Sequence, residues 1–467
     1  MPKLALSMIV RDAAATLRGC LDSAKGAVDE ILIADTGSVD GTPEIAHEYG
    51  ARFIHIPWEN DFAAARNRAL AEVTADWVLS LDADEMLDAE SAREIRNFLE
   101  KGASGQTAGV QVTIRNYVLS LEDRIWDRPA RPNDSRLPAA QSYPAYVEHE
   151  NVRLFRCDPR IRFLGRVHES VGASIEQAGL GLGRSRLLIH HFGLACDAET
   201  RARKNIFYRD LGRKKIAEMP DHFQAYLELG IVELDNFDNA REACEHFDRA
   251  AALNPKFGVA WFFAGLARVK LGEFRKALEC VKKAQKLGHR TSFVFETSGD
   301  AHYNLGEFPQ AAEAYERAMR ILADRSLVQS KRGLAIVRTG QAEKGLATIR
   351  EALEHKPVHA EIHDRLILAL AWLAKDRDAA VAAEEKLRRV REPLPSDFLR
   401  AAKLWASLGE SPRAAAVLHV GSVVYPQNAM LRQAIEELSA RDAEDVKKVL
   451  ERLTNEVGIG AGTGARS

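Results

Sequence analysis

The chain has 467 residues, of which 46% are hydrophobic and 28% are charged, and its formal net charge is −2. This length is sufficient for two to four domains with substantial cores. The near-neutral charge gives no electrostatic footprint for nucleic acid, so we expect no nucleic-acid partner.

The cysteines and the apolar runs lead us to expect a cytoplasmic protein. The five cysteines are scattered and include no Cys-x-x-Cys pair, which favours a reducing compartment. The apolar opening at residues 4–10 is too short for a signal peptide, and Arg11 and Asp12 follow it directly. The longest apolar stretch elsewhere, residues 366–374, has about half the length that a bilayer requires, so no transmembrane segment is expected.

Residues 1–196 alternate short apolar runs with amphipathic stretches. Strands are predicted at residues 4–10, 30–34, 52–56, 77–81 and 110–117, and helices at 14–24, 43–49 and 62–73. Strands that alternate with helices imply an α/β domain whose parallel sheet has crossover connections.

Carboxylates follow the apolar strand at residues 77–81, in the sequence Asp82-Ala83-Asp84-Glu85. Open α/β sheets bind ligands at the carboxyl ends of their strands, so Asp82 and Asp84 are placed where chemistry is expected. Two such carboxylates suit Mg²⁺ or Mn²⁺, which in turn can bind phosphates. The same spacing recurs at Asp376 and Asp378, in an expected solvent-facing helix turn, so the pattern alone is weak and its context must decide.

The segment after the last predicted strand is rich in proline. Residues 118–147 contain Pro129, Pro132, Pro138 and Pro144 and are predicted to form a mobile loop or lid on the acceptor side. Residues 149–156 then resemble a half-buried strand that returns to the sheet.

A basic helix is predicted at residues 197–221 as a linker between the two halves. Its basic residues are Arg201, Arg203, Lys204, Arg209, Arg213, Lys214 and Lys215. It is either a solvated helix that packs on the following helices or a contact for an anionic lipid or lipid-linked acceptor. The second possibility would place the protein peripherally at the inner face of the membrane.

A period of 34 to 35 residues governs residues 222–427. The corresponding large or polar positions are Tyr226, Trp261, Phe295, Gln329, His363 and Phe398. Small residues such as Gly230, Gly299 and Gly333 follow most of them, which resembles the helix–turn–helix of the tetratricopeptide repeat. We expect about six repeats, then a capping helix at 428–456 and a disordered tail at 457–467.

Four N-terminal motifs in this order resemble the GT-A fold glycosyltransferases of family 2. They are the opening strand Leu6–Val10, the turn Asp35–Thr42, the helix Ala63–Ala69 and the strand end Asp82–Glu85. The resemblance covers about residues 1–195 and looks closest to bacterial family 2 enzymes that carry tetratricopeptide repeats. It is also similar to lipopolysaccharide-core glycosyltransferases. It implies a Rossmann-like nucleotide-diphospho-sugar transferase domain followed by an all-α superhelix.

On the donor side, the resemblance implies that Asp35 recognises uracil and that Arg66 and Asn67 border the diphosphate. It further implies that Asp82 contacts the ribose or shares the cation and that Asp84 binds the cation directly. Two structural alternatives stay open: Asp35 caps its own turn, and Arg66 forms a surface salt bridge.

The residues on the acceptor side are harder to predict from the sequence. An inverting transfer needs a general base, and no acidic pair follows the metal motif at the position usual in the family. We predict Glu169 as the base, oriented by His168; the alternative is an ion pair of Glu169 with an arginine such as Arg166. His190 or His191 is predicted to complete the coordination of the metal, although a lone histidine is more often structural.

We therefore expect a metal-dependent glycosyltransferase that uses a nucleotide-diphosphate sugar, with UDP as the expected nucleotide and inversion as the expected outcome. The acceptor would be a polypeptide or a cell-envelope glycan or lipid. The repeats would present a groove to a polypeptide or form a homodimer. The alternative is a non-catalytic interaction scaffold with a degenerate transferase domain. A phosphatase is disfavoured because its Asp-x-Asp motif should follow an early strand.

Overall fold

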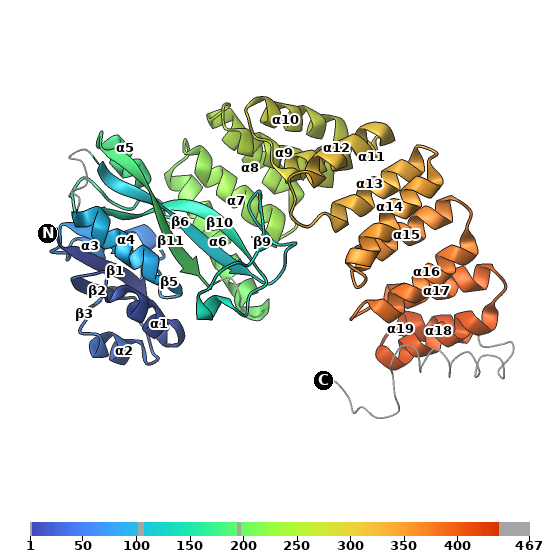
Figure 1. Cartoon of the computed structure of the whole chain (residues 1–467), viewed down its shortest axis with the longest axis horizontal. Helices are drawn as coiled ribbons and strands as arrows, with labels where there is room; N and C mark the ends of the chain where they lie inside the picture. Colours follow the sequence, from blue (N-terminus) through green and yellow to red (C-terminus); the bar gives the residue numbers. More distant parts are fainter. Residues whose placement is uncertain (1, 101–106, 194–197, 439–467) are drawn as a thin grey trace. The chain divides into compact units, whose positions relative to one another are not determined.

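The computed structural model of the chain describes residues 2–100, 107–193 and 198–438 (Figure 1). These divide into two compact units, residues 1–273 with 282–289, and residues 274–281 with 290–467. Each unit is described by itself. Most of the predicted capping helix and the whole predicted tail lie outside the described residues.

The first unit opens with strands and helices in alternation, close to the predicted ranges. They are β1 (Leu4–Val10), α1 (Ala14–Ala24), β2 (Glu30–Asp35), α2 (Thr42–Glu48), β3 (Arg52–His55), α3 (Phe62–Leu70), β4 (Trp77–Ser80), β5 (Glu85–Leu87) and α4 (Ala89–Glu100). The sheet is completed by β6 (Thr107–Val118), β10 (Ala145–Arg156), α5 (Gly172–Gln177) and β11 (Gly181–His191). The three-residue strand β5 was not predicted.

The strands form one sheet in the order β3-β2-β1-β4-β10-β6-β11-β5. The pairs β1–β2, β1–β4 and β2–β3 are parallel, as predicted. The predicted parallel pairing does not continue beyond β4, because β10 runs antiparallel to β4 and β6 and β5 runs antiparallel to β11. The sheet is therefore mixed.

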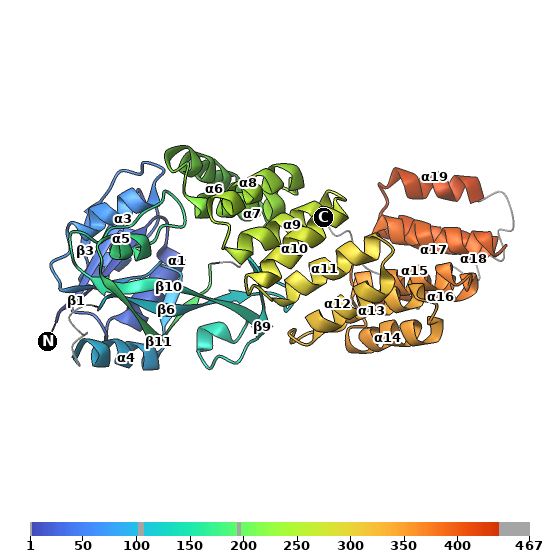
Figure 2. The ribbon, with the colours of Figure 1, turned by 90° about the horizontal axis from the view of Figure 1, so that it is seen from above.

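Helices cover both faces of this sheet, which explains why its parallel strands β1 and β4 are almost wholly buried. Apolar residues of α1, α2 and α4, such as Leu17, Ala46 and Ile95, pack on one face. Ala63 of α3 and Ile175 of α5 pack on the other (Figure 2). Because β1 pairs in parallel with both β2 and β4, the carboxyl ends of these three strands meet at the same edge of the sheet.

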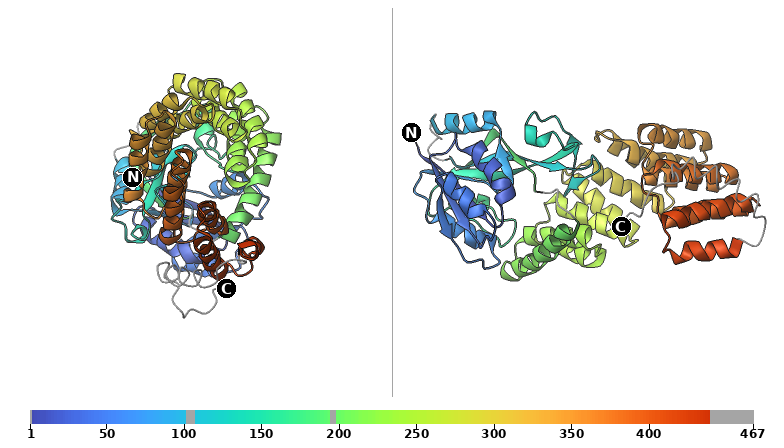
Figure 3. Two further views of the ribbon diagram at one scale, coloured as in Figure 1. Left: turned by 90° about the vertical axis from the view of Figure 1, so that its right-hand side faces the viewer. Right: turned by 90° about the horizontal axis from the view of Figure 1, so that it is seen from below.

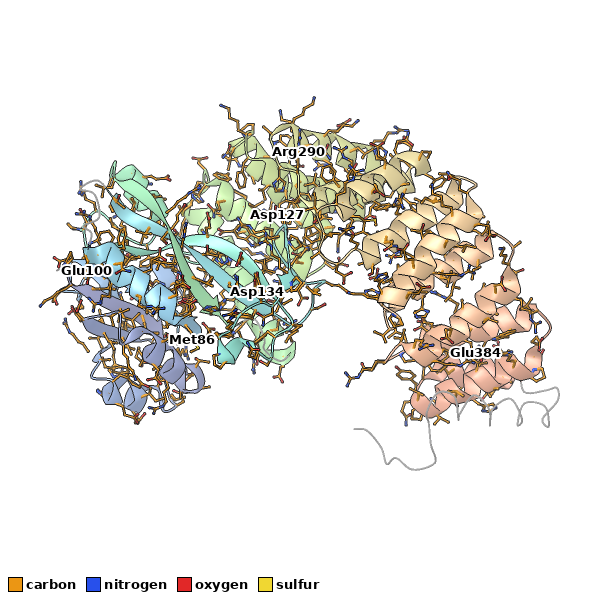
Figure 4. The ribbon with its side chains drawn as sticks, in the orientation of Figure 1. Met86, Glu100, Asp127, Asp134, Arg290 and Glu384 are labelled. Carbon is orange, nitrogen blue, oxygen red and sulfur yellow. The ribbon has the colours of Figure 1, made fainter. Side chains whose placement is uncertain are left out.

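The predicted lid contains the short strands β7 (Arg124–Ile125), β8 (Arg128–Pro129) and β9 (Arg131–Pro132) and one 3-10 turn, η1 (Pro138–Ala140). Its hairpin contacts the helical part of the same unit: Arg124 pairs with Asp235 of α7 at 2.5 Å, and Asp127, labelled in Figure 4, lies 2.9 Å from His289 in the loop after residue 286. These contacts anchor the hairpin; its mobility stays a prediction.

The first unit continues into the helical region. Its helices are α6 (Ala198–Glu218), α7 (Phe223–Asn236), α8 (Ala240–Leu253) and α9 (Gly258–Lys270), and α10 (Phe274–Lys286) is divided between the two units. The second unit contains α11 (Ser292–Asn304), α12 (Phe308–Met319), α13 (Ser326–Arg338), α14 (Ala342–His355), α15 (Ala360–Trp372), α16 (Asp376–Arg389), α17 (Pro395–Ser407), α18 (Ser411–Val424) and α19 (Ala429–Leu438). Figure 3 shows neighbouring helices of this unit, coloured orange to red, packed in chain order.

Glycines allow the paired helices to approach each other, as the repeat pattern predicts. A Cβ atom on Gly230 of α7 would lie 2.5 Å from the ring of Phe247 in α8. A Cβ atom on Gly299 would likewise lie 2.5 Å from the ring of Tyr315, and a Cβ atom on Gly333 would lie 2.6 Å from the side chain of Ile349. The large residue of one helix thus fills the space left by the small residue of its partner, which is tetratricopeptide packing.

Candidate active site

The site lies at the strand ends where β1, β2 and β4 meet. Val10 and Asp35 are partners in the β1–β2 register, and Asp82 follows two residues after the end of β4. The Asp35 carboxylate is 1% exposed and accepts hydrogen bonds from the backbone of Gly37 and Ser38 at 3.1 Å and from the Ser38 hydroxyl at 2.5 Å. Asp35 therefore shapes its own turn, as the structural alternative expects.

Arg66 is the buried centre of the site. Its guanidinium donates through Nε to Glu169 at 2.6 Å, through Nη2 to Asp82 at 2.5 Å and through Nη1 to the Ser80 hydroxyl at 3.3 Å. The face of Phe163 lies beneath it, 5.4 Å from the ring centroid. The surface salt bridge proposed as an alternative is therefore wrong, because Arg66 is only 6% exposed.

A second arginine, Arg153 of β10, holds the acidic motif from the other side. Its Nη2 donates to Asp82 Oδ2 at 3.1 Å and to Glu85 Oε1 at 2.8 Å. Glu85, at the start of β5 beside Met86 (labelled in Figure 4), also accepts from the Asp82 backbone N–H at 2.8 Å. Sequence reasoning gave Arg153 and Glu85 no role; a charged residue in a half-buried strand was the available signal.

These arginines decide the charge of Asp82. Burial alone would raise the pKa of its carboxyl group, but Arg66 and Arg153 outweigh that effect and hold the pKa below its ordinary value. Asp82 is thus a fixed carboxylate, with both oxygens in ion pairs.

Asp84 pairs with a histidine instead. Nε2 of His191, at the end of β11, lies 3.6 Å from Asp84 Oδ1. Nδ1 of His191 lies 2.8 Å from Oδ1 of Asn116, whose amide nitrogen donates to the Val147 carbonyl at 3.1 Å. Because the Val147 carbonyl can only accept, it orients the Asn116 amide, and His191 must donate from Nδ1. Nε2 then faces Asp84. Burial lowers the pKa of His191, but the bond to Asp84 and the charges of Glu85 and Asp82 outweigh it and raise the pKa, which favours a proton on Nε2 directed at the carboxylate.

The structure does not bring His190 to the acidic motif. Successive side chains of a strand point to opposite faces, so His190 lies on the other face of β11 from His191. Its Nδ1 hydrogen-bonds the Tyr117 hydroxyl at 2.8 Å, and its Nε2 lies 3.5 Å from Asp88. Of the two predicted histidines, His191 is therefore the one beside Asp84.

The donor chemistry of Asp84 and His191 fits a hard divalent cation only in part. Within the described residues, no group of three or more His, Cys, Asp or Glu side chains could hold a metal ion. Asp84 and His191 supply one carboxylate and one imidazole, and Mg²⁺ commonly takes one or two protein carboxylates together with phosphates and water. Gly193 lets both side chains approach its backbone closely, because a Cβ atom there would collide with Asp84 Oδ2 and with His191 Nε2.

The segment 163–170 carries the predicted base to Arg66. Asn67 fixes it: the Asn67 amide donates to the Phe163 carbonyl at 2.9 Å and accepts from the Phe163 N–H at 2.8 Å. Glu169 pairs with Arg66, whereas Arg166 pairs with Glu218 of α6 at 2.6 Å. The Glu169 ion pair predicted as an alternative thus exists, but with another arginine.

A buried lysine of α6 anchors the same segment. Lys215 Nζ donates to the Val167 carbonyl and to Glu228 of α7, both at 2.7 Å. Lys215 and Glu228 are 3% and 5% exposed. Between Val167 and Glu169, the backbone of His168 adopts φ = +52°, a sparsely populated region for a residue with a side chain. The predicted linker helix, α6, therefore contacts the segment that carries Glu169, through Lys215.

A comparison with known families identifies the N-terminal part of the chain. The model described as Glycosyl transferase family 2 matches residues 7–161. Residues 7–161 form a glycosyltransferase family 2 domain. The match ends before Glu169, His191 and Lys215, so these residues lie outside the region that the family model recognises.

Several curated proteins share similarity with the chain. A TPR repeat-containing protein of Synechococcus elongatus is 42% identical over 175 residues, 38% of this chain and 37% of that protein. The SPbeta prophage-derived glycosyltransferase SunS of Bacillus subtilis is 25% identical over 170 residues, 36% and 34% of the two chains. The lipopolysaccharide core biosynthesis glycosyltransferase LpsC of Rhizobium meliloti is 28% identical over 209 residues, 43% and 67%. The chain spans about a third of the length of the first two relatives.

Among solved structures, the chain is similar to a tetratricopeptide repeat protein from Parabacteroides merdae. The similarity covers 51% of this chain and 94% of that protein at 12% identity, with a TM-score of 0.41.

Within the described residues, no helix is long and apolar enough to span a membrane.

Proposed function

We propose that the protein is a metal-dependent glycosyltransferase that takes its sugar from a nucleotide diphosphate, with UDP as the nucleotide. The family 2 domain supports the reaction class. The observation that carries the proposal is the Asp84–His191 pair, which stands beside the Arg66–Asp82–Arg153 network at the strand ends.

Each donor-side residue receives a role from its surroundings. Asp82, locked by two arginines, presents a carboxylate of fixed orientation that can accept hydrogen bonds from the ribose hydroxyl groups. Asp35 retains acceptor capacity for the uracil N–H beyond the bonds of its own turn. Arg66 borders the diphosphate. Asp84 and His191 would hold Mg²⁺ or Mn²⁺, which supplies stabilisation of the diphosphate leaving group when bound.

Glu169 is the general base in this proposal. It would take the proton of the acceptor nucleophile on the side opposite the leaving group, giving inversion. Its ion pair with Arg66 fixes one oxygen, at 2.6 Å, and so fixes the orientation of the carboxylate. His168, next to it in the chain, helps to shape this side of the site.

The acceptor is a polypeptide or a cell-envelope glycan or lipid. The printed name of one partly covered relative, a lipopolysaccharide core biosynthesis glycosyltransferase, supports a cell-envelope acceptor. The repeats support a polypeptide partner by their packing. Homodimer formation and peripheral attachment to the inner face of the membrane stay predictions from the sequence.

The non-catalytic scaffold is the less favoured alternative. A degenerate domain has no requirement to keep a buried arginine, Arg66, positioned on two carboxylates and a histidine, His191, held beside Asp84 by Asn116. The glycosyltransferase names of the relatives also favour the enzyme.

The test is a panel of nucleotide sugars with Mn²⁺ or Mg²⁺, in which hydrolysis and binding are measured for three proteins. Wild type should bind and slowly hydrolyse one donor, and Asp84→Ala should lose metal-dependent binding. Asp378→Ala is the matched control, because it removes a carboxylate of the same Asp-x-Asp spacing from an exposed turn of α16. If wild type binds no donor, the enzyme proposal is wrong.

A further inference from the structure

Helix α6 begins 37 residues after the end of the family 2 match, yet it contributes a side chain to the site. The predicted roles for this helix were a linker or a lipid contact. Its tyrosine, Tyr208, instead faces the segment that carries Glu169. The helix belongs to the same compact unit as the sheet.

The ring of Tyr208 lies among other rings of the site. It stacks on Phe62, at the start of α3, with centroids 6.3 Å apart and planes 28° apart. It also stacks on His168, with centroids 6.3 Å apart and planes 25° apart. Trp58 packs edge-on against Phe62, with ring centroids 4.8 Å apart, and so supports the ring of Phe62. These rings come from three separate parts of the chain, so their meeting is a product of the tertiary fold.

The hydroxyl end of Tyr208 lies within the electrostatic reach of the acidic residues. Burial raises the pKa of the phenol, and the charges of Asp82, Glu169 and Asp84 raise it further. The phenol therefore stays neutral and keeps its O–H as a hydrogen-bond donor. By its ring contacts, Tyr208 packs on His168, the chain neighbour of Glu169, and on Phe62, which lies one turn before Arg66 in α3.

We propose that Tyr208, supported by Phe62 and His168, is a contact for the transferred sugar of the donor. This inference rests on the proposed function. The sugar is bonded to the diphosphate and must lie between the diphosphate and the base. A pyranose ring presents an apolar C–H face and hydroxyl groups at its edge, which match an aromatic face that ends in a hydroxyl group.

The experiment compares binding of a sugar nucleotide with binding of its nucleotide. Calorimetry with Mn²⁺ measures the Kd of UDP and of the UDP-sugar that wild type binds most tightly, among UDP-glucose, UDP-galactose and UDP-N-acetylglucosamine. The variants are Tyr208→Ala, Tyr208→Phe and Tyr226→Ala. Tyr226 is a partly buried tyrosine of the same compact unit whose ring contacts are His246 and Arg249, so it controls for loss of a tyrosine side chain.

We expect Tyr208→Ala to weaken UDP-sugar binding by about tenfold and to leave the Kd of UDP within about twofold. Tyr208→Phe, which keeps the ring but loses the hydroxyl donor, should weaken UDP-sugar binding by less than Tyr208→Ala does, and Tyr226→Ala should change neither constant. An equal loss of UDP and UDP-sugar affinity in Tyr208→Ala overturns this inference alone, as does an unchanged Kd for both. A wild-type protein that binds neither ligand overturns the proposed function itself.

Discussion

Asn116 accepts a hydrogen bond from Nδ1 of His191 at 2.8 Å, and this contact decides which nitrogen of the histidine faces Asp84. A second residue that fixes the tautomer in this way is typical of histidines that ligate metals. Asn116 lies in β6 and His191 in β11, which pair in parallel with these two residues as register partners. The pairing of β6 with β11 therefore holds the imidazole of His191 in a fixed orientation.

The first prediction uses two adjacent histidines as a matched pair. His191→Ala should weaken Mn²⁺ binding in the presence of UDP by about 10- to 100-fold, because it removes one of two protein donors. His190→Ala removes the same kind of side chain from the opposite face of β11 and should leave Mn²⁺ affinity within about threefold. Calorimetry or Mn²⁺ electron paramagnetic resonance gives both affinities. Equal losses in both variants would contradict the assignment of His191.

The second prediction separates the two roles of Glu169. As a general base, Glu169→Gln should lower kcat for transfer by about 100-fold or more and leave the Kd of the donor within about threefold. If Glu169 serves only to position Arg66, the Kd of the donor should rise instead, because the neutral amide no longer holds the guanidinium by an ion pair. Steady-state kinetics together with donor binding measures both quantities, and a preserved kcat would contradict the base.

The third prediction concerns the buried pair of Lys215 and Glu228. Lys215→Met should destabilise the protein by about 3 to 5 kcal/mol, because it leaves the Glu228 carboxylate buried and unpaired. The double variant Lys215→Met/Glu228→Gln should recover part of this loss, since it removes the uncompensated charge. Urea unfolding followed by circular dichroism compares the proteins. Hydrogen exchange at residues 163–170 should rise in both variants, since both lose the bond from Lys215 to the Val167 carbonyl.

The fourth prediction is a pH dependence from His149. Burial, with the charges of Arg153 and Arg128, lowers the pKa of His149 to about 4 from its ordinary value of 6.5. The folded state then binds fewer protons than the unfolded state between these values. The contribution of neutral His149 to stability is therefore complete above about pH 6.5 and is lost as the pH falls toward 4, by up to about 3 kcal/mol.

The variant His149→Asn tests this dependence. Its amide oxygen can replace Nδ1 as the acceptor for Asn116, whose amide nitrogen lies 2.8 Å from His149 Nδ1. The difference in unfolding free energy between wild type and variant should shrink or reverse between pH 6.5 and 4. A difference that stays constant across this range would contradict the lowered pKa.

The sequence predicts the positions of the first four strands well because each is an apolar run with a clear end. It does not predict the direction of β10, because an alternating run such as residues 149–156 fits a parallel or an antiparallel neighbour equally. The strand β5 spans only Glu85–Leu87, too short for any periodicity. The exposed Asp376 and Asp378 confirm that the same acidic spacing also occurs as solvent-facing helix decoration.

Within the site, the sequence supplies residue types but not faces or partners. That the acidic motif and Arg66 belong to one site could be predicted from the order of the motifs along the chain. The choice between His190 and His191 depends on the register of β11, which a single sequence does not fix. Arg153 and Tyr208 reach the site through long-range packing, with neither a motif nor a spacing to mark them.

The bond between Lys215 and Glu228 has a consequence for how this protein can be divided. The sequence places the start of the repeats at residue 222, between these two residues, and suggests a transferase that could be separated from them. A chain cut at that position would lose the carboxylate that neutralises a lysine buried against the Val167 carbonyl. The first repeat helix thus shares a buried ion pair with the helix that anchors residues 163–170, and we expect an exchange of repeats to preserve this pair only when the join lies beyond α7.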